Sequence, residues 1–98
     1  MHSKYVTKME SISQEHGTPD EIWIPLHKEF NFQIDLCASP ENALLPRFYT
    51  KNDNVFTKDI IETSFANIEF VRAKKFAKKF YDDSNKFGST IVMLCTVK

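Results

Sequence analysis

FQIDLCASPENALLPRFYTKNDNVFTKD, residues 32–59, is the stretch from which the rest of this chain is best interpreted. Its first apolar residues, Phe32, Ile34 and Leu36, alternate with polar ones, and this period of two predicts a half-buried β-strand. The turn-forming residues 39–42 follow directly. An acid and small residues at the end of a strand, followed by a polar loop, are typical of the ligand crevice of an open α/β sheet.

Length and composition indicate one small globular domain. The chain has 98 residues, of which 42% are hydrophobic and 13% aromatic, and this suits a single domain with a modest core. Lys+Arg 13 and Asp+Glu 13 give a formal net charge of zero, which argues against a strongly basic nucleic-acid-binding protein. We expect residues 1–17 to form an N-terminal arm or a loosely held helix, and residues 18–98 to form the domain.

Cysteine and histidine usage bears on compartment and metal binding. Cys37 and Cys95 are expected to be reduced thiols of a cytoplasmic protein, since no signal peptide is recognised. The histidines and cysteines lack the spacing of zinc ligands, so no metal site is predicted. No run approaches the roughly 18 apolar residues of a membrane-spanning helix.

A helix is predicted to begin at Thr18 and Pro19. The Thr18 hydroxyl can cap the helix, and Pro19 suits the first helical position. Trp23 lies on the apolar face and is interpreted as a core residue. Pro25 lacks a backbone donor, so we expect a kink or two short turns at that point.

The second half of the chain predicts a strand, a helix and a strand. Residues 63–68 and 89–97 have strand length and apolar character, and residues 70–79 between them have helical periodicity. This order predicts a right-handed βαβ crossover. The loop 39–58 lacks clear periodicity and is long enough to suggest a function. The expected fold class is α/β, with a small, mostly parallel three-stranded sheet flanked by helices, a partial Rossmann-like core.

The first strand and its loop also carry a family resemblance. The residues DLCASPENA at 35–43, PRFYT at 46–50 and Asp53 resemble the phage-type DNA adenine methyltransferases, the Dam-type family. The resemblance covers roughly residues 17–97. It spans nearly all of this chain but only the front part of a family member, which implies a truncated methyltransferase-like core.

The resemblance implies a site for S-adenosylmethionine at the end of the first strand. In the family, a Thr-Pro turn and an acid in the following loop lie beside this cofactor. The residues that correspond here are Thr18, Pro19, Asp35, Ala38 and Asp53. S-adenosylmethionine is thus a candidate ligand, although a binding protein without chemistry would require no cofactor.

The family's catalytic motif, Asn/Asp-Pro-Pro-Tyr/Phe, corresponds to Asn67-Ile68-Glu69-Phe70 in this chain. In the family, the first side chain and a proline carbonyl accept hydrogen bonds from the target amine, and the aromatic ring stacks on the flipped base. Asn67 and Phe70 keep the acceptor and the ring, but both prolines are replaced. We interpret the motif as degenerate and inactive, and expect Asn67 to cap the next helix and Phe70 to enter the core.

Three functions remain open. The first is a non-catalytic protein of phage or prophage origin that binds a protein partner in the cytoplasm of a bacterial host, as an inhibitor of a host defence system. The second is an S-adenosylmethionine-dependent DNA adenine-N6 methyltransferase, or a subunit of one that works as a dimer. The third is a DNA-binding remnant that uses a basic helix face, although such a face is also expected to be simply solvated. That face comprises Arg72, Lys74, Lys75, Lys78 and Lys79.

A short sheet with unpaired edges favours association with a protein partner or with a second copy of the chain, or coverage of the edge by the N-terminal arm. DNA is a further candidate partner. Neither a membrane nor a metal ion is expected among the partners.

Overall fold

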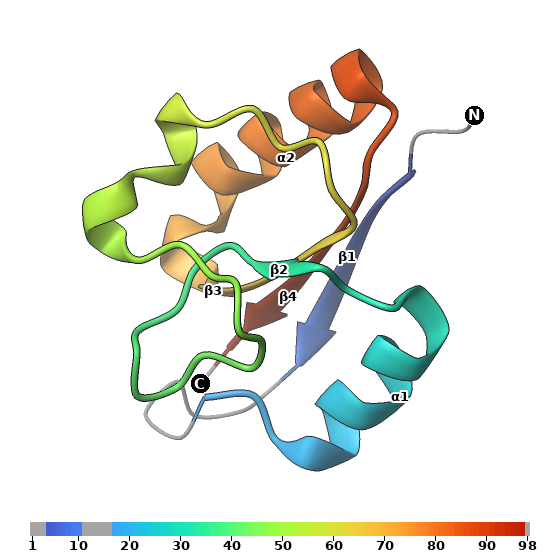
Figure 1. The fold of residues 1–98 in the computed structure, drawn as a ribbon, viewed down its shortest axis with the longest axis vertical. Helices are drawn as coiled ribbons and strands as arrows, with labels where there is room; N and C mark the ends of the chain where they lie inside the picture. The colour runs from blue at the N-terminus through green and yellow to red at the C-terminus, as the bar shows by residue number, and fades with distance from the viewer. Residues whose placement is uncertain (1–3, 11–16, 98) are drawn as a thin grey trace.

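Four parallel strands form one sheet with a helix on each of its faces (Figure 1). The computed structural model describes residues 4–10 and 17–97. The strand order across the sheet is β1-β4-β3-β2. The elements are β1 (Lys4–Glu10), α1 (Asp20–Phe30), β2 (Ile34–Asp35), the 3₁₀ turns η2 (Lys51–Asp53) and η3 (Val55–Thr57), β3 (Ser64–Glu69), the 3₁₀ turn η4 (Phe70–Arg72), α2 (Ala73–Phe87) and β4 (Thr90–Thr96). The α/β class with a parallel sheet is confirmed, with four strands instead of three.

β1 is the strand that the sequence interpretation missed. It pairs in parallel with β4, and Tyr5 lies beside Ile91 in this pairing. Because β4 is buried along almost its whole length, an unpaired edge there would leave backbone donors and acceptors without partners. The helix expected within residues 1–17 is therefore wrong for the part that forms β1, and residues 11–16 lie outside the described residues.

The β3–α2–β4 unit is confirmed as two parallel neighbouring strands joined through a helix. The turn η4 precedes the helix, so α2 begins at Ala73 and continues past residue 79 to Phe87. Gly88 ends the helix with φ +72°, and its N–H donates to the carbonyl oxygen of Ser84 at 2.9 Å. Glycine adopts this left-handed conformation without steric penalty, which explains why the helix ends there.

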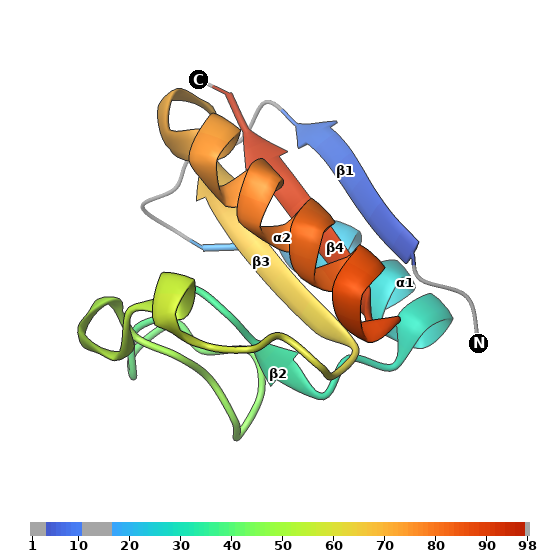
Figure 2. The same cartoon turned by 90° about the horizontal axis from the view of Figure 1, so that it is seen from above.

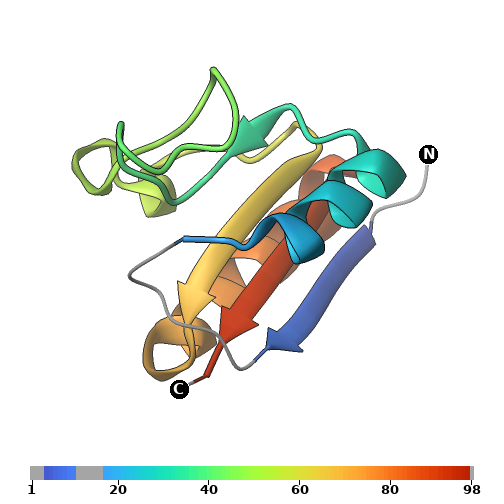
Figure 3. The same ribbon diagram turned by 90° about the horizontal axis from the view of Figure 1, so that it is seen from below.

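The two helices lie on opposite faces of the sheet, as Figures 2 and 3 show. Side chains of β4 alternate between the two cores that result. Ile91, Met93 and Cys95 pack on the α2 side, whereas Val92 and Leu94 pack on the α1 side. A strand buried on both faces accounts for the continuous apolar run in the sequence.

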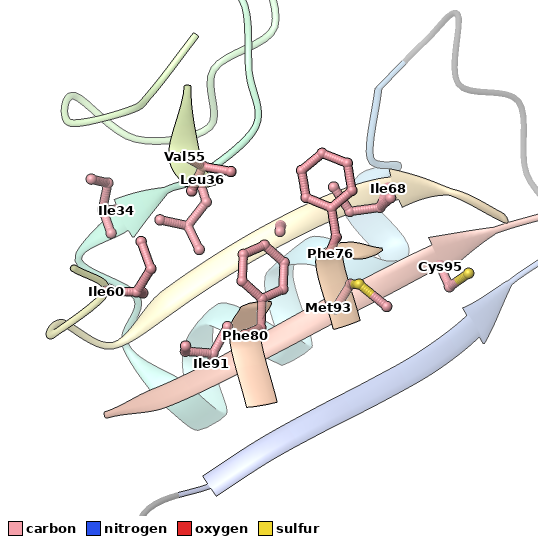
Figure 4. Close-up of a cluster of buried hydrophobic side chains, with 11 residues drawn as sticks. Ile34, Leu36, Val55, Ile60, Ile68, Phe76, Phe80, Ile91, Met93 and Cys95 are labelled. Atoms are coloured by element: carbon pink, nitrogen blue, oxygen red, sulfur yellow. The ribbon is translucent and has the colours of Figure 1, made fainter. Parts of the chain in front are cut away.

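Aromatic side chains fill both cores. On the α2 side, Phe76 and Phe80 lie among side chains from β2, β3 and β4 (Figure 4), and both rings are buried. On the α1 side, the centroid of the Trp23 ring lies 5.5 Å from that of Phe32 and 5.0 Å from that of Phe65. The prediction that Trp23 is a core residue is confirmed.

α1 corrects two local expectations. It runs as one helix with Pro25 inside it, not as two short turns. Its N-cap residue is Pro19, and no side chain caps the helix. The expected capping by Thr18 is therefore wrong, because the Thr18 hydroxyl is bonded to a residue of β3 instead. Asn31 ends the helix in the left-handed conformation.

The long loop after β2 folds back along that strand. The N–H of Asp35 donates to the carbonyl of Arg47 at 3.1 Å, and the N–H of Tyr49 donates to the carbonyl of Asp35 at 2.9 Å. A third bond of 3.0 Å joins the N–H of Ala38 to the carbonyl of Tyr49. The outer edge of β2 is thus covered by its own loop, and Val55 anchors the same loop in the α2-side core.

Candidate functional site

A pocket of about 570 Å³ opens at the carboxyl ends of β2 and β3. Its lining comes from residues within four segments, 36–42, 50–56, 67–69 and 72–76. The crevice beyond the carboxyl ends of parallel strands is where open α/β sheets bind ligands. Small-molecule sites typically enclose about 300–1,000 Å³, so this pocket has room for a nucleoside-sized ligand.

Asp35 is the last residue of β2 and directly precedes the lining residue Leu36. Its side chain is buried, and its two carboxylate oxygens accept hydrogen bonds from the N–H of Cys37 (3.4 Å) and of Leu44 (3.3 Å). Burial raises the pKa of Asp35, and the two backbone donors oppose that rise. The carboxyl group therefore holds the loop 37–44 in place.

Two small residues form the pocket wall that follows Asp35. Cys37 and Ala38 both line the pocket. Burial, together with the nearby Asp35, raises the pKa of the Cys37 thiol to about 12. The sulfur is therefore a protonated, weakly polar wall and not a nucleophile at neutral pH.

Asp53 is the last residue of η2 and does not itself line the pocket. Its carboxylate accepts hydrogen bonds from the N–H of Thr50 (2.7 Å) and from the Thr50 hydroxyl (3.1 Å). These bonds lower the pKa of Asp53. Asn54 follows with φ +53°, and its side chain accepts from the N–H of Phe56. The acid thus shapes a turn whose neighbours, Thr50 and Asn54, face the pocket.

The Thr-Pro turn contacts the first residue of the segment 67–70. The side-chain amide of Asn67 donates a hydrogen bond of 2.7 Å to the hydroxyl oxygen of Thr18. Asn67 also lines the pocket, whereas Thr18 and Pro19 lie half-buried behind it. The structure therefore brings together two positions that the family resemblance linked to one site.

Two expectations about the residues 67–70 are wrong. Asn67 lies within β3 and caps no helix, since the residues that precede η4 and α2 are Glu69 and Arg72. Phe70 stays out of the core and is 55% exposed. The physical reason is that β3 continues to Glu69, so the chain turns into the helix beyond Asn67, and the first helical turn points outward.

Cations and an aromatic ring surround the mouth of the pocket. Lys51, Arg72 and Lys75 line it together with the single carboxylate of Glu69. The Phe56 ring, which is 38% exposed, lines the same side. The described lining therefore carries an excess of positive charge beside an accessible aromatic surface.

The remaining basic residues of α2 differ in environment. Lys74 and Lys78 are exposed on the outer face of the helix, and Lys78 pairs with Asp82 at 3.0 Å. Lys79 is only 15% exposed, pairs with Asp83 at 2.9 Å and donates to the carbonyl of Lys58 at 2.6 Å. Lys79 therefore fastens the loop to the helix, and its assignment to a solvated basic face is wrong.

Sequence reasoning missed several residues of the site. Thr50, Lys51, Asn54 and Phe56 line the pocket, yet the loop that carries them has no periodic pattern to indicate which way each points. In the same loop, Val55 packs in the α2-side core, and the Phe56 ring contacts that of Phe76. The turn-forming pair at 53–54 was the available signal, since it reverses the chain toward β2.

Metal and membrane sites were also considered. Within residues 4–10 and 17–97, no group of three His, Cys, Asp or Glu side chains could hold a metal ion. No helix in that part of the chain is long and apolar enough to cross a membrane.

Comparison with known proteins identifies the family of this chain. The chain has no significant match among curated proteins or among solved structures. The family model described as DNA N-6-adenine-methyltransferase (Dam) matches residues 6–98. Because this match spans the sheet, both helices and the pocket, the chain belongs to the DNA N-6-adenine-methyltransferase (Dam) family.

Proposed function

We propose that this chain is a Dam-family domain that binds S-adenosylmethionine in the pocket at the carboxyl ends of β2 and β3, and that it does not methylate DNA by itself. The observation that carries the proposal is the pocket of about 570 Å³ at the carboxyl ends of these strands, into which Asn67 projects from β3. Family membership supports this ligand, since Dam-type enzymes take their methyl group from it.

The residues of the pocket suit the parts of this ligand. Phe56 offers an exposed ring for an adenine base, and Thr50 and Asn54 offer polar side chains beside it. Ala38 leaves space where a larger side chain would fill the wall. The cofactor would supply an electrophilic methyl group, and the residues of this chain would hold and orient it.

The geometry of the degenerate motif argues against methyl transfer. The carbonyl oxygen of Ile68, at the first proline position of the family motif, accepts a hydrogen bond of 3.3 Å from the Thr96 hydroxyl. The Phe70 ring, which would stack on the base, is exposed and does not line the pocket. Since a misplacement of about 1 Å can cost about 100-fold in rate, this arrangement supports binding without useful turnover.

Calorimetry with S-adenosylmethionine tests the binding. Phe56→Ala should weaken binding about tenfold or more, because an aromatic ring that stacks on a base is removed. Phe70→Ala is the matched control, since it removes a ring outside the pocket and should bind like the wild type. No binding by the wild-type chain, or equal losses in both variants, would contradict the assignment of the pocket.

Radiolabelled methyl transfer tests the absence of catalysis. The purified chain should transfer no methyl group to unmethylated duplex or single-stranded DNA above the background of DNA without protein. Transfer that Asn67→Ala abolishes would show a working catalytic pocket, and the chain would then be a methyltransferase in its own right.

A second candidate function is binding of an acidic protein partner, and inhibition of a host defence system would be one form of it. The observation that favours it is an apolar side chain of η4 that lies beside cations of η4 and of the first turns of α2. Val71 is 84% exposed, and the hollow beside it is lined by Arg72, Lys74, Lys75 and Lys78.

Products of the genes that neighbour this one are the probes for this second function. Val71→Asp should abolish binding of an acidic neighbour product. Ile61→Asp, which changes an exposed apolar residue that precedes β3, should not. If no neighbour product binds, or if both variants bind alike, the surface at Val71 has no such role.

A further inference from the structure

The charge at the mouth of the pocket does not match the ligand proposed above. Three cations, Lys51, Arg72 and Lys75, line the pocket against one carboxylate, Glu69. S-adenosylmethionine carries a sulfonium and an ammonium group against one carboxylate, so it is a net cation at neutral pH. An excess of positive charge at the mouth therefore suits an anionic ligand that occupies the pocket in place of S-adenosylmethionine.

The cations at the mouth are held in place without being neutralised. The Arg72 guanidinium lies 5.5 Å from the centroid of the Phe76 ring, and the Lys75 ammonium lies 5.4 Å from that of Phe56. The two rings contact each other, with centroids 4.7 Å apart. Contacts of this kind orient a cation while leaving its donors available.

Two lysines of α2 that lie farther from the mouth differ from Arg72 and Lys75 in their ion pairing. Lys78 and Lys79, farther along the same helix, each form an ion pair with an aspartate. Among the described residues, Arg72, Lys75 and Lys51 form no ion pair. The charges of the three cations that line the pocket are thus available to a ligand.

We propose that Lys51, Arg72 and Lys75 bind the phosphate of a nucleotide whose base lies against Phe56. Arginine and lysine together are the side chains that recognise phosphate oxygens, through several charge-assisted hydrogen bonds. Phe56 supplies the surface on which a base can stack. The inference rests on the proposed pocket but not on the binding of S-adenosylmethionine. The phosphate belongs either to a free nucleotide or to a nucleotide within single-stranded DNA.

Calorimetry with adenosine and adenosine 5′-monophosphate tests the phosphate site. The monophosphate should bind about tenfold or more tightly than adenosine, because the phosphate adds charge-assisted bonds. The double variant Arg72→Gln/Lys75→Gln should bind both ligands at the adenosine level. The matched control, Lys74→Gln/Lys78→Gln, removes the same charge from the same helix outside the mouth and should keep the preference for the monophosphate.

Three results would overturn the inference. These are equal binding of adenosine and its monophosphate, failure of the monophosphate and of DNA to bind at all, and equal losses in the two double variants. The last result would mean that only the overall charge of α2 matters.

A single-stranded oligodeoxynucleotide distinguishes the two sources of the phosphate. Tighter binding of the oligonucleotide than of the monophosphate, with a steep dependence on salt, would identify DNA as the source. Equal or weaker binding would identify a free nucleotide. S-adenosylmethionine should bind the Arg72→Gln/Lys75→Gln variant at least as tightly as the wild type. Absence of phosphate binding and absence of S-adenosylmethionine binding are therefore detected by separate measurements.

Discussion

The side-chain amide of Asn67 donates a hydrogen bond of 2.7 Å to the hydroxyl oxygen of Thr18, across a separation of 49 residues. Asn67 lies in β3, and Thr18 lies directly before α1. The bond orients the Asn67 side chain at the pocket and ties the start of α1 to the carboxyl end of the sheet. A threonine that sequence reasoning places at a helix cap thus acts on the site.

Loss of the Thr18 hydroxyl should weaken ligand binding. Thr18→Val keeps the shape of the side chain but removes the acceptor for Asn67. Since a typical hydrogen bond contributes about 0.5–1.5 kcal/mol, we expect S-adenosylmethionine affinity to fall about 2- to 12-fold. Calorimetry is the measurement, and Thr18→Ser, which keeps the hydroxyl, should bind like the wild type. Wild-type affinity in Thr18→Val would mean that the bond does not position Asn67 for binding.

The phenylalanines of α2 and η4 should differ sharply in their contribution to stability. Phe76 is 5% exposed and lies in the α2-side core, whereas Phe70 is 55% exposed. Phe76→Ala should lower the free energy of unfolding by about 3–5 kcal/mol through lost contacts and a cavity. Phe70→Ala should change it by less than about 0.5 kcal/mol. Denaturant unfolding measures both, and a loss below about 1 kcal/mol for Phe76→Ala would place its ring outside the core.

Much of the fold follows from sequence patterns that act locally. The β-branched apolar run 89–97 indicates a buried strand, and the 3.6-residue stripe of 70–79 indicates a helix; both were predicted correctly in type. β1 could not be predicted in this way, because residues 4–10 become a strand only when the edge of β4 is there to pair with them. Tertiary pairing, not local preference, decides such a segment.

The site was predictable in position but not in detail. The acid and small residues after β2 indicated a crevice, and the structure has a pocket there. The contact between Thr18 and Asn67 could not be read from either residue alone, because both are also good capping residues. The inward turn of Phe56 depends on how η3 packs on α2, which no short-range pattern determines.

The two ion pairs of α2 should contribute very differently to stability. Asp83 is buried, pairs with the partly buried Lys79 and accepts the N–H of Ile60 at 3.0 Å. Asp83→Ala leaves both donors without this acceptor and should cost about 3–5 kcal/mol. Asp82→Ala breaks the exposed pair with Lys78 and should cost less than about 1 kcal/mol. Thermal and denaturant unfolding of the two variants measure this difference, and similar costs would show that burial of the pair does not matter.

The buried carboxyl group of Asp35 should make the stability of the fold depend on pH. Burial raises the pKa of Asp35 above its ordinary value of 3.8. Between that value and the raised folded pKa, the folded state binds more protons than the unfolded state. The contribution of Asp35 to the free energy of unfolding therefore falls as pH rises through this window, and is constant above it. Asp35→Asn removes the titration while keeping one oxygen that can accept from Cys37 or Leu44.

The pH effect is best measured as a difference between chains, since other acids titrate in the same range. Denaturant unfolding from pH 3 to pH 7 should show the wild type losing stability relative to Asp35→Asn as pH rises. Asp53→Asn is the control of opposite sign, because hydrogen bonds from Thr50 lower the pKa of Asp53. The wild type should gain stability relative to that variant as pH rises toward and past 3.8, the ordinary value for Asp53. A difference between wild type and Asp35→Asn that stays constant with pH would mean that the Asp35 carboxyl group has the same pKa in the folded and unfolded chain.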